Sequence, residues 1–198
     1  MEEVNVEIKA SATFKFKFFG WLEAEARRWK NPDGSEGGIV ALDATVDAKI
    51  SLSLDVVIGP RASIGDGASI GYGASIGDGA SIYDGASIGY GASIGDGASI
   101  YDGASIGDGA SIGDGDWHMT VWPIGSRNAM TTAVYSKEHG LRWFVGCQRG
   151  ITTDELRERI EDDHGSNEHA VNYLAAIAFV EGHPGLLVAR ETSKADAS

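Results

Sequence analysis

The sequence is short of the residues that mark disulfide-bonded and membrane-spanning proteins. It has one cysteine, Cys147, among 198 residues, which excludes an intrachain disulfide framework. No apolar stretch is long enough to span a bilayer. The first residues, Met-Glu-Glu-Val-Asn, are acidic where a secretory signal is basic and then apolar. We therefore expect a cytoplasmic protein that does not bind membranes.

Basic residues are also scarce, with 16 Lys and Arg against 29 Asp and Glu and a net charge of -13. The imbalance is greatest in residues 55–116, which carry nine Asp and one Arg. Binding to phosphates relies on Lys and Arg that displace counterions, so we expect no nucleic acid partner. An acidic surface favours a basic partner or a cation, and solubility alone is a simpler explanation than either.

Glycine, in contrast, is abundant, with 28 residues that lie mostly in one repeat. From Ile58 to Ile112 an isoleucine recurs at every sixth residue, within variants of Ala-Ser-Ile-Gly-Asp-Gly. This period fits neither a helix of 3.6 residues per turn nor the alternation of a flat sheet. It predicts a parallel β-helix, a solenoid of short strands joined by tight bends. The frame extends back through Leu52 and Val46 to Val40, which makes thirteen rungs.

Within such a coil the isoleucines and alanines are expected to face inward, while Ser, Asp and Tyr face solvent. Residues 70–87 and 88–105 are identical, so equivalent side chains are expected to lie on neighbouring coils, about 4.8 Å apart. The repeat therefore predicts two tyrosine pairs and two carboxylate columns: Tyr72 with Tyr90, Tyr83 with Tyr101, Asp66 with Asp84 and Asp102, and Asp78 with Asp96 and Asp114.

The array resembles the left-handed parallel β-helix of the hexapeptide-repeat proteins. Their motif is an aliphatic residue, often a following glycine, and a small residue four places on, as in Ile64-Gly65-Asp66-Gly67-Ala68-Ser69. The resemblance implies three hexads in each triangular coil, a little over four coils, and trimers formed side by side. The best-known members are acyltransferases with a histidine as general base, and related carbonic anhydrases hold zinc with three histidines. Here no histidine lies between Val40 and Asp116.

Residues ahead of the array predict a β cap. Residues 4–18 alternate between apolar and mainly polar side chains, which predicts one or two half-buried strands. Residues 21–30 fit a short helix or a strand that returns to Asn31-Pro32-Asp33-Gly34, and we favour the strand. Either form can cover the open end of the solenoid, which would otherwise expose apolar side chains and unpaired backbone.

Residues after Asp116 predict an α+β module. Met130 to Tyr135 and Leu141 to Cys147 fit a β-hairpin that turns at Gly140. Thr152 and Glu155 form a capping box for a helix that ends at Gly165. A second helix is expected from about Asn167 to Val180, with an apolar stripe of Val171, Leu174, Ile177 and Ala178.

The expected fold is therefore mainly β, in four segments. These are an N-terminal β cap (1–38), a left-handed parallel β-helix (39–116), an α+β module (117–185) and a flexible tail (186–198). The layout also resembles an uncharacterised group of bacterial and phage proteins with a hexapeptide array and a small C-terminal module. That resemblance implies no activity, and it rests on Gly125-Ser126-Arg127-Asn128, Thr132 to Tyr135, Val145-Gly146-Cys147, Glu155, His164-Gly165 and Tyr173.

Candidate binding residues fall into two groups. The tyrosines of the array, Tyr72, Tyr90, Tyr83 and Tyr101, are of a type that often anchors contacts, although stacking that only stabilises neighbouring coils explains them equally well. The reactive types in the module are Arg127, Tyr135, Cys147, Arg149, His164 and His169. A cysteine near a histidine can act as nucleophile and base. A buried strand cysteine and a histidine at a helix C-terminus each also have a structural explanation.

The carboxylate columns have two readings as well. Oxygen ligands in a row suit calcium or magnesium, but Asp-Gly is also a pair that tight turns prefer, and we favour the turn. We thus predict neither a metal site nor a cofactor. The sequence favours a non-enzymatic scaffold that trimerises through the solenoid and displays a binding module. In one version of this hypothesis the protein is encoded by a phage and engages a host factor. The alternative is an acyltransferase-like enzyme with its site between solenoid and module, using Cys147 or His164.

Overall fold

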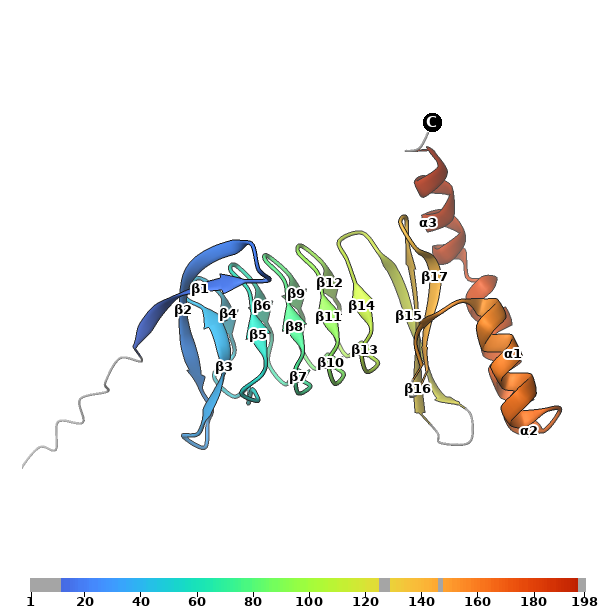
Figure 1. Ribbon diagram of the computed structural model, residues 1–198, viewed down its shortest axis with the longest axis horizontal. Helices are drawn as coiled ribbons and strands as arrows, with labels where there is room; N and C mark the ends of the chain where they lie inside the picture. The colour runs from blue at the N-terminus through green and yellow to red at the C-terminus, as the bar shows by residue number, and fades with distance from the viewer. Residues whose placement is uncertain (1–11, 125–128, 146–147, 196–198) are drawn as a thin grey trace, which may run out of the picture.

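The computed structural model describes residues 12–124, 129–145 and 148–195 and shows a mainly β chain (Figure 1). Along the long axis, a β-hairpin is followed by a solenoid of about four turns, a small antiparallel sheet and three helices. The mainly β fold expected from the sequence is confirmed. The division into four segments, with the boundaries given above, stays a prediction.

The solenoid has three faces, each a parallel sheet of short strands. The first face contains β3 (Glu36–Ala41), β5 (Val57–Ile58), β8 (Ser75–Ile76), β11 (Ser93–Ile94) and β14 (Ser111–Ile112). The second contains β4 (Thr45–Val46), β6 (Ser63–Ile64), β9 (Ser81–Ile82) and β12 (Ser99–Ile100). The third contains β7 (Ser69–Ile70), β10 (Ser87–Ile88) and β13 (Ser105–Ile106). Paired residues such as Ile70, Ile88 and Ile106 are 18 apart, so three hexads make one coil.

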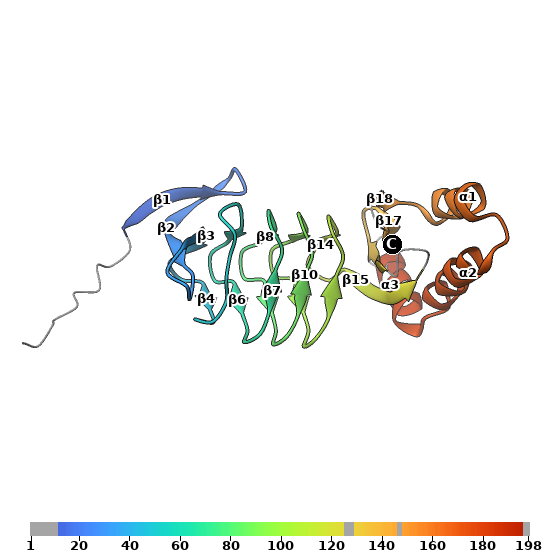
Figure 2. The ribbon, with the colours of Figure 1, turned by 90° about the horizontal axis from the view of Figure 1, so that it is seen from below.

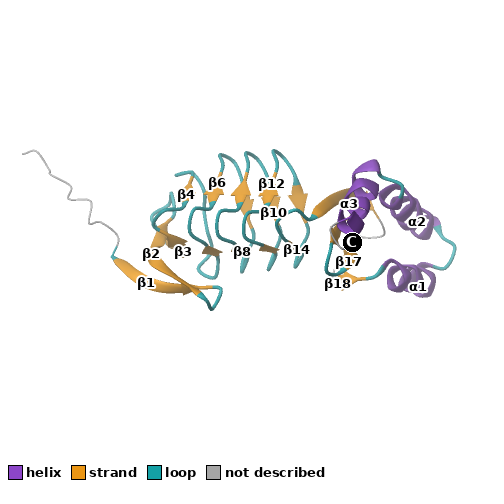
Figure 3. Cartoon of the chain, turned by 90° about the horizontal axis from the view of Figure 1, so that it is seen from above, coloured by secondary structure: helices purple, strands orange, loops and turns teal. Residues whose placement is uncertain are grey.

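The coil is left-handed. Advancing toward the C-terminal end, the chain passes from β8 at the front of Figure 1 to β9 at the upper back and then to β10 at the lower back. Figures 2 and 3 show the same order from below and from above.

The rungs of the array form the core as the period predicts. Every isoleucine from Ile58 to Ile112 exposes 7% or less of its surface, and the alanines between them are buried apart from the partly buried Ala104. Full burial of one such side chain contributes about 1.5–3 kcal/mol, so the ladders are a large part of the stability. Leu52 fills its rung and is buried, although its backbone belongs to no strand.

The corners turn at the glycine three residues after each isoleucine. From Gly67 to Gly115 these glycines have φ between 61° and 72°, a region that strains residues with a side chain. Arg61 holds the equivalent place in the hexad before Gly67 and adopts φ 57°. Glycine is therefore the residue that this corner favours, although Arg61 shows that a residue with a side chain can also occupy it.

The N-terminal hairpin closes the first end of the solenoid. Strands β1 (Thr13–Phe18) and β2 (Leu22–Lys30) are antiparallel, and β2 also pairs with β3. The strand assignment for residues 21–30 is thus confirmed, while residues 4–11 of the first expected strand lie outside the described residues. Trp29 is buried and donates from Nε1 to the Ile50 carbonyl at 2.8 Å. The Asn31 side chain binds both the N–H and the C=O of Leu52, at 2.8 and 3.1 Å, where no earlier coil can do so.

A four-stranded antiparallel sheet closes the other end. Its strands are β15 (Trp117–Ile124), β16 (Ala129–Ser136), β17 (Gly140–Val145) and β18 (Gln148–Ile151), and the expected hairpin turns at Gly140. Val134 and Phe144 pack into the solenoid core, whereas Ala133 and Trp143 face the helices. Thr132 Oγ1 accepts from the Gly107 amide at 2.9 Å, and the Thr120 hydroxyl donates to the Ser105 carbonyl. Threonine side chains thus replace the missing next coil.

Three helices cover the outer face of this sheet. Helix α1 (Thr153–His164) begins at the Thr152–Glu155 capping box and is followed by Gly165, as expected. Helix α2 (Glu168–Glu181) begins after Asn167, also as expected. Helix α3 (Pro184–Ala195) was not expected: the prediction of a flexible tail from residue 186 is wrong for residues 186–195, which form a helix with Leu186 fully buried in the module core. Residues 196–198 of that tail lie outside the described residues.

The expected apolar stripe of α2 is also wrong in part. Its buried residues are Ala170, Ala176, Ile177 and Val180, and of the expected stripe only Ile177 is among them. Val171 and Leu174 are exposed. The helix is apolar on nearly all sides, so periodicity alone cannot indicate which side meets the sheet.

No single described helix is long and apolar enough to cross a bilayer. Helices α2 and α3 reach the required length and composition only when taken together, across a bend of 49°.

Candidate functional site

The tyrosine pairs stack as the repeat predicts. The ring centroids of Tyr72 and Tyr90 are 5.5 Å apart with planes at 12°, and those of Tyr83 and Tyr101 are 5.6 Å apart at 13°. All four rings are exposed. A hydrogen bond to Asp55 raises the pKa of Tyr72.

These pairs border one face of the solenoid. Tyr83 and Tyr101 lie at the corner before the sheet β7–β10–β13, and Tyr72 and Tyr90 at the corner after it. The serines of the three strands, Ser69, Ser87 and Ser105, stand in register between the two corners. We call this surface the tyrosine-bordered face. It repeats along the axis, and in the single chain its tyrosines and Ser69 are exposed while Ser87 and Ser105 are partly exposed.

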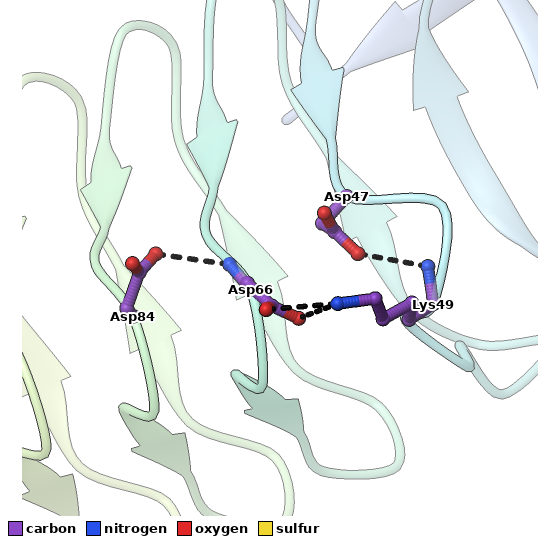
Figure 4. Close-up of polar contacts among 4 residues, drawn as sticks. All are labelled: Asp47, Lys49, Asp66 and Asp84. Carbon is purple, nitrogen blue, oxygen red and sulfur yellow. Dashed lines mark hydrogen bonds and ion pairs between the residues drawn. The ribbon is translucent and has the colours of Figure 1, made fainter.

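The carboxylates of the corners hold neighbouring coils together. Asp84 Oδ1 accepts from the Asp66 amide at 2.9 Å, and Asp96 Oδ1 accepts from the Asp78 amide at 2.8 Å. Asp108 does the same for the Tyr90 amide at 2.7 Å. Asp47 instead bonds within its own turn, to the Lys49 amide (Figure 4). The expected bond of an aspartate within its own turn is thus seen at Asp47, whereas Asp84, Asp96 and Asp108 instead accept from the preceding coil.

The glycine before each bonded amide makes room for this contact. A Cβ on Gly65 would lie 2.3 Å from Asp84 Oδ1, and one on Gly77 would lie 2.6 Å from Asp96 Oδ1. Tyr83 occupies the equivalent place in its coil, and there the described residues include no bond from the Asp84 amide to Asp102. The Gly-Asp pair is therefore a matched unit, with the glycine in one coil and the aspartate in the next.

Two cations close the carboxylate columns at their N-terminal ends. Lys49 Nζ lies 3.0 and 2.9 Å from the two oxygens of Asp66, and this hydrogen bond raises the pKa of Lys49 (Figure 4). Arg61 makes a two-pronged contact with Asp78, with Nε 2.9 Å from Oδ1. Within the described ranges, no three His, Cys, Asp or Glu side chains are grouped as metal ligands.

The module candidates lie in different surroundings. His164, at the end of α1, stacks on Tyr173 with ring centroids 5.7 Å apart and planes at 16°, and it meets the edge of His169 at 5.7 Å. Tyr135 is partly buried, and the Arg190 guanidinium lies over its ring at 5.8 Å. Arg127 and Cys147 lie outside the described residues, and Arg149 belongs to β18 without a described side chain. The alternative of an enzyme that uses Cys147 or His164 thus stays a hypothesis.

Two features of the module escaped the sequence. The first is a pocket of about 550 Å³ between the last coil and the β16–β17 hairpin, lined among others by Ser111, Asp116, Val134, His139, Arg142 and Phe144. Burial raises the pKa of Asp116, against the opposing effect of the Gly113 amide. Because the pocket joins segments without a common repeat, no spacing in the sequence indicates it.

The second feature is an exposed apolar face on α2. Val171, Leu174, Ala175, Ala178 and Phe179 are all exposed and follow one another around the helix surface. No Asp, Glu, Lys or Arg occurs between Glu168 and Glu181. The helical spacing of these apolar residues was visible in the sequence, but the sequence did not indicate which side of the helix faces solvent.

The fold and these surfaces define a class: a parallel β-helix protein with both ends of the solenoid closed by added elements. No protein-family model matches the chain, and a comparison with curated proteins finds no significant match.

Proposed function

We propose that the protein is a non-enzymatic scaffold, related in its array to the hexapeptide-repeat proteins, that associates side by side with copies of itself and displays its C-terminal module to a protein partner. One observation carries the proposal. Several outward aspartates of the coils serve coil-to-coil contacts, while the rings of the tyrosine pairs and the apolar face of α2 are exposed.

The arrangement of these surfaces supports contact between copies. Helix α2 lies on the same side of the molecule as β7 and β10 in Figure 2, and on the side of β6 and β12 in Figure 3, whereas α1 lies on the side of β8 and β14. A neighbour alongside the tyrosine-bordered face would therefore also approach α2. Tyrosines contribute a large rigid area with little loss of side-chain entropy.

A trimer is the assembly we propose. In a ring of three, each contact joins two different patches, so the Asp columns of one copy need not meet those of the next. A two-fold contact through the same face would set like charges against each other. The uncharged α2 face carries no such penalty, which favours it as a second contact region.

The partner of the displayed module is proposed to be a protein with a basic surface. The net charge of -13 attracts such a partner at long range and repels nucleic acids. A host factor engaged by a phage-encoded protein would be one such case.

Light scattering and sedimentation measure the mass of the assembly and so test the association. We expect the unaltered protein to have three times the chain mass at micromolar concentration. The double substitution Tyr72→Ala with Tyr90→Ala should weaken association by at least about fivefold, since aromatic anchors contribute more than about 1 kcal/mol. Trp21→Ala removes an equally exposed aromatic ring from the β1–β2 turn and should change nothing. A strict monomer at all concentrations would contradict the trimer, and an unaffected double variant would leave the tyrosines as coil-stacking residues.

A further inference from the structure

The pocket at the solenoid–module junction is open because the closing sheet covers only part of the last coil. Thr132 and Thr120 bind the β13 segment, and Val134 and Phe144 cover the core. Arg142 lies opposite Val134 in the β16–β17 register and so belongs to the same side of the sheet. Its side chain lines the pocket together with Ser111, Gly113 and Asp116.

The last coil offers a backbone donor to this pocket. In the inner coils of this face the serine amide donates to an alanine carbonyl of the next coil, as Ser75 does to Ala92 at 2.9 Å and Ser93 to Ala110 at 2.8 Å. Strand β14 is the edge strand of its sheet, and no described group accepts the Ser111 amide. The Gly113 amide also has no following coil to accept its hydrogen bond, but Asp116 Oδ2 accepts from it at 2.7 Å.

The arginine is similarly available. The Arg142 guanidinium donates to the Leu141 carbonyl at 3.2 Å, and no described carboxylate lies within ion-pair distance. The amide and hydroxyl of Thr152 bond to the Glu155 carboxylate and lower its pKa, and the charge of Arg142 adds to this effect. Glu155 is therefore already held by Thr152. The acids of the pocket have contacts of their own: Asp116 holds Gly113, and Glu138 lies 3.8 Å from His139.

We propose that this pocket binds a small organic acid, with its carboxylate on Arg142 and the Ser111 amide and its apolar body against Val134 and Phe144. A guanidinium with a planar fork of donors is the side chain best suited to a carboxylate. An amide from an edge strand adds a directed second donor. The two apolar residues form a surface that a bare inorganic anion cannot use. The site is independent of the self-association proposed above.

Nuclear magnetic resonance of the full chain, labelled with ¹⁵N, tests the proposal with three probes. Benzoate supplies both the anion and the apolar ring, benzamide keeps the shape without the charge, and inorganic phosphate supplies an anion alone. We expect benzoate to shift the Ser111 amide and Arg142 Nε signals saturably. Benzamide and phosphate should each bind at least tenfold more weakly.

Two variants complete the test. Arg142→Gln should weaken benzoate binding at least tenfold, and its amide spectrum reports whether the fold is kept. Arg159→Gln removes the same charge from the exposed surface of α1 and should leave binding unchanged. The proposal is overturned if benzoate shifts no signals saturably, if benzamide or phosphate binds as tightly as benzoate, or if the two variants behave alike.

Discussion

Alanine at Gly77 should destabilise the protein more than alanine at Gly79, two residues away in the same corner. A Cβ on Gly77 would lie 2.6 Å from the amide nitrogen and from Oδ1 of Asp96 in the next coil. Since such distances are too short for a real Cβ, the coils must separate or the Asp96 side chain must turn away. A Cβ on Gly79 would meet nothing within 4 Å, but the backbone there has φ +67°.

The two costs have different origins and sizes. At Gly77 the bond from the Asp78 amide to Asp96, 2.8 Å long, is lost, which for a charged acceptor costs about 1.5–3 kcal/mol. Overpacking adds about 1–3 kcal/mol, at the low end here because Tyr83 shows that a corner of this solenoid accepts a Cβ once the bond is absent. At Gly79 a left-handed backbone costs about 1–2 kcal/mol. We therefore expect a loss of about 3 kcal/mol at Gly77 and about 1 kcal/mol at Gly79.

Urea unfolding followed by circular dichroism measures both values, with the slope of the transition checked for each variant because repeat arrays can unfold in steps. Asp96→Ala is the control that removes the bond without adding a Cβ at Gly77, and it should cost about 1.5 kcal/mol. Equal losses at Gly77 and Gly79, or a larger loss at Gly79, would refute the idea that the glycine makes room for the carboxylate of the next coil.

Three further predictions concern the two ends of the solenoid. Trp29→Phe keeps an aromatic ring but removes the indole N–H bond to Ile50 and part of the buried ring, so urea unfolding should show a loss of at least about 1 kcal/mol, and no loss would contradict a role of Trp29 in closing this end. Thr132→Val leaves the Gly107 amide buried without an acceptor, which should cost about 1–3 kcal/mol and speed hydrogen exchange at Gly107, whereas unchanged exchange would contradict its closing role. Burial lowers the pKa of His118 below 6.5, so the folded state resists its protonation. Its contribution to the free energy of unfolding is therefore complete above pH 6.5 and is lost as the pH falls. Between pH 7.5 and 5.5 the stability of His118→Phe should fall less steeply than that of the unaltered protein, and parallel curves would exclude the effect.

Local and repeated features were predictable from the sequence. The isoleucine period predicts the solenoid, its core and the stacking of Tyr72 on Tyr90, because each coil meets a nearly identical coil 18 residues on. The capping box at Thr152 and the turn at Gly140 were predictable because they depend on residues a few positions apart.

The module resisted prediction where its elements depend on distant contacts. Residues 186–195 of helix α3 were expected to belong to a tail because polar residues follow Ala189, yet the apolar start of the helix places Leu186 in the module core. Helix α2 was recognised, but its buried side was not, because an apolar helix can pack with more than one side. The junction pocket had no counterpart among the predicted site residues; it brings together Ser111, Asp116 and Arg142 from segments that share no periodicity.

The sequence by itself determined the solenoid and its core, because the hexad sets the inward position of each isoleucine and places a glycine at most corners; its left hand was implied only by the resemblance to hexapeptide-repeat proteins. It also determined which carboxylates and tyrosines line up along the axis. Only the tertiary structure decided how the solenoid ends, since that depends on pairs such as Gly107 with Thr132 and Leu52 with Asn31. The same closure decided where a pocket is left open, because a sheet laid across a triangular coil covers only part of it.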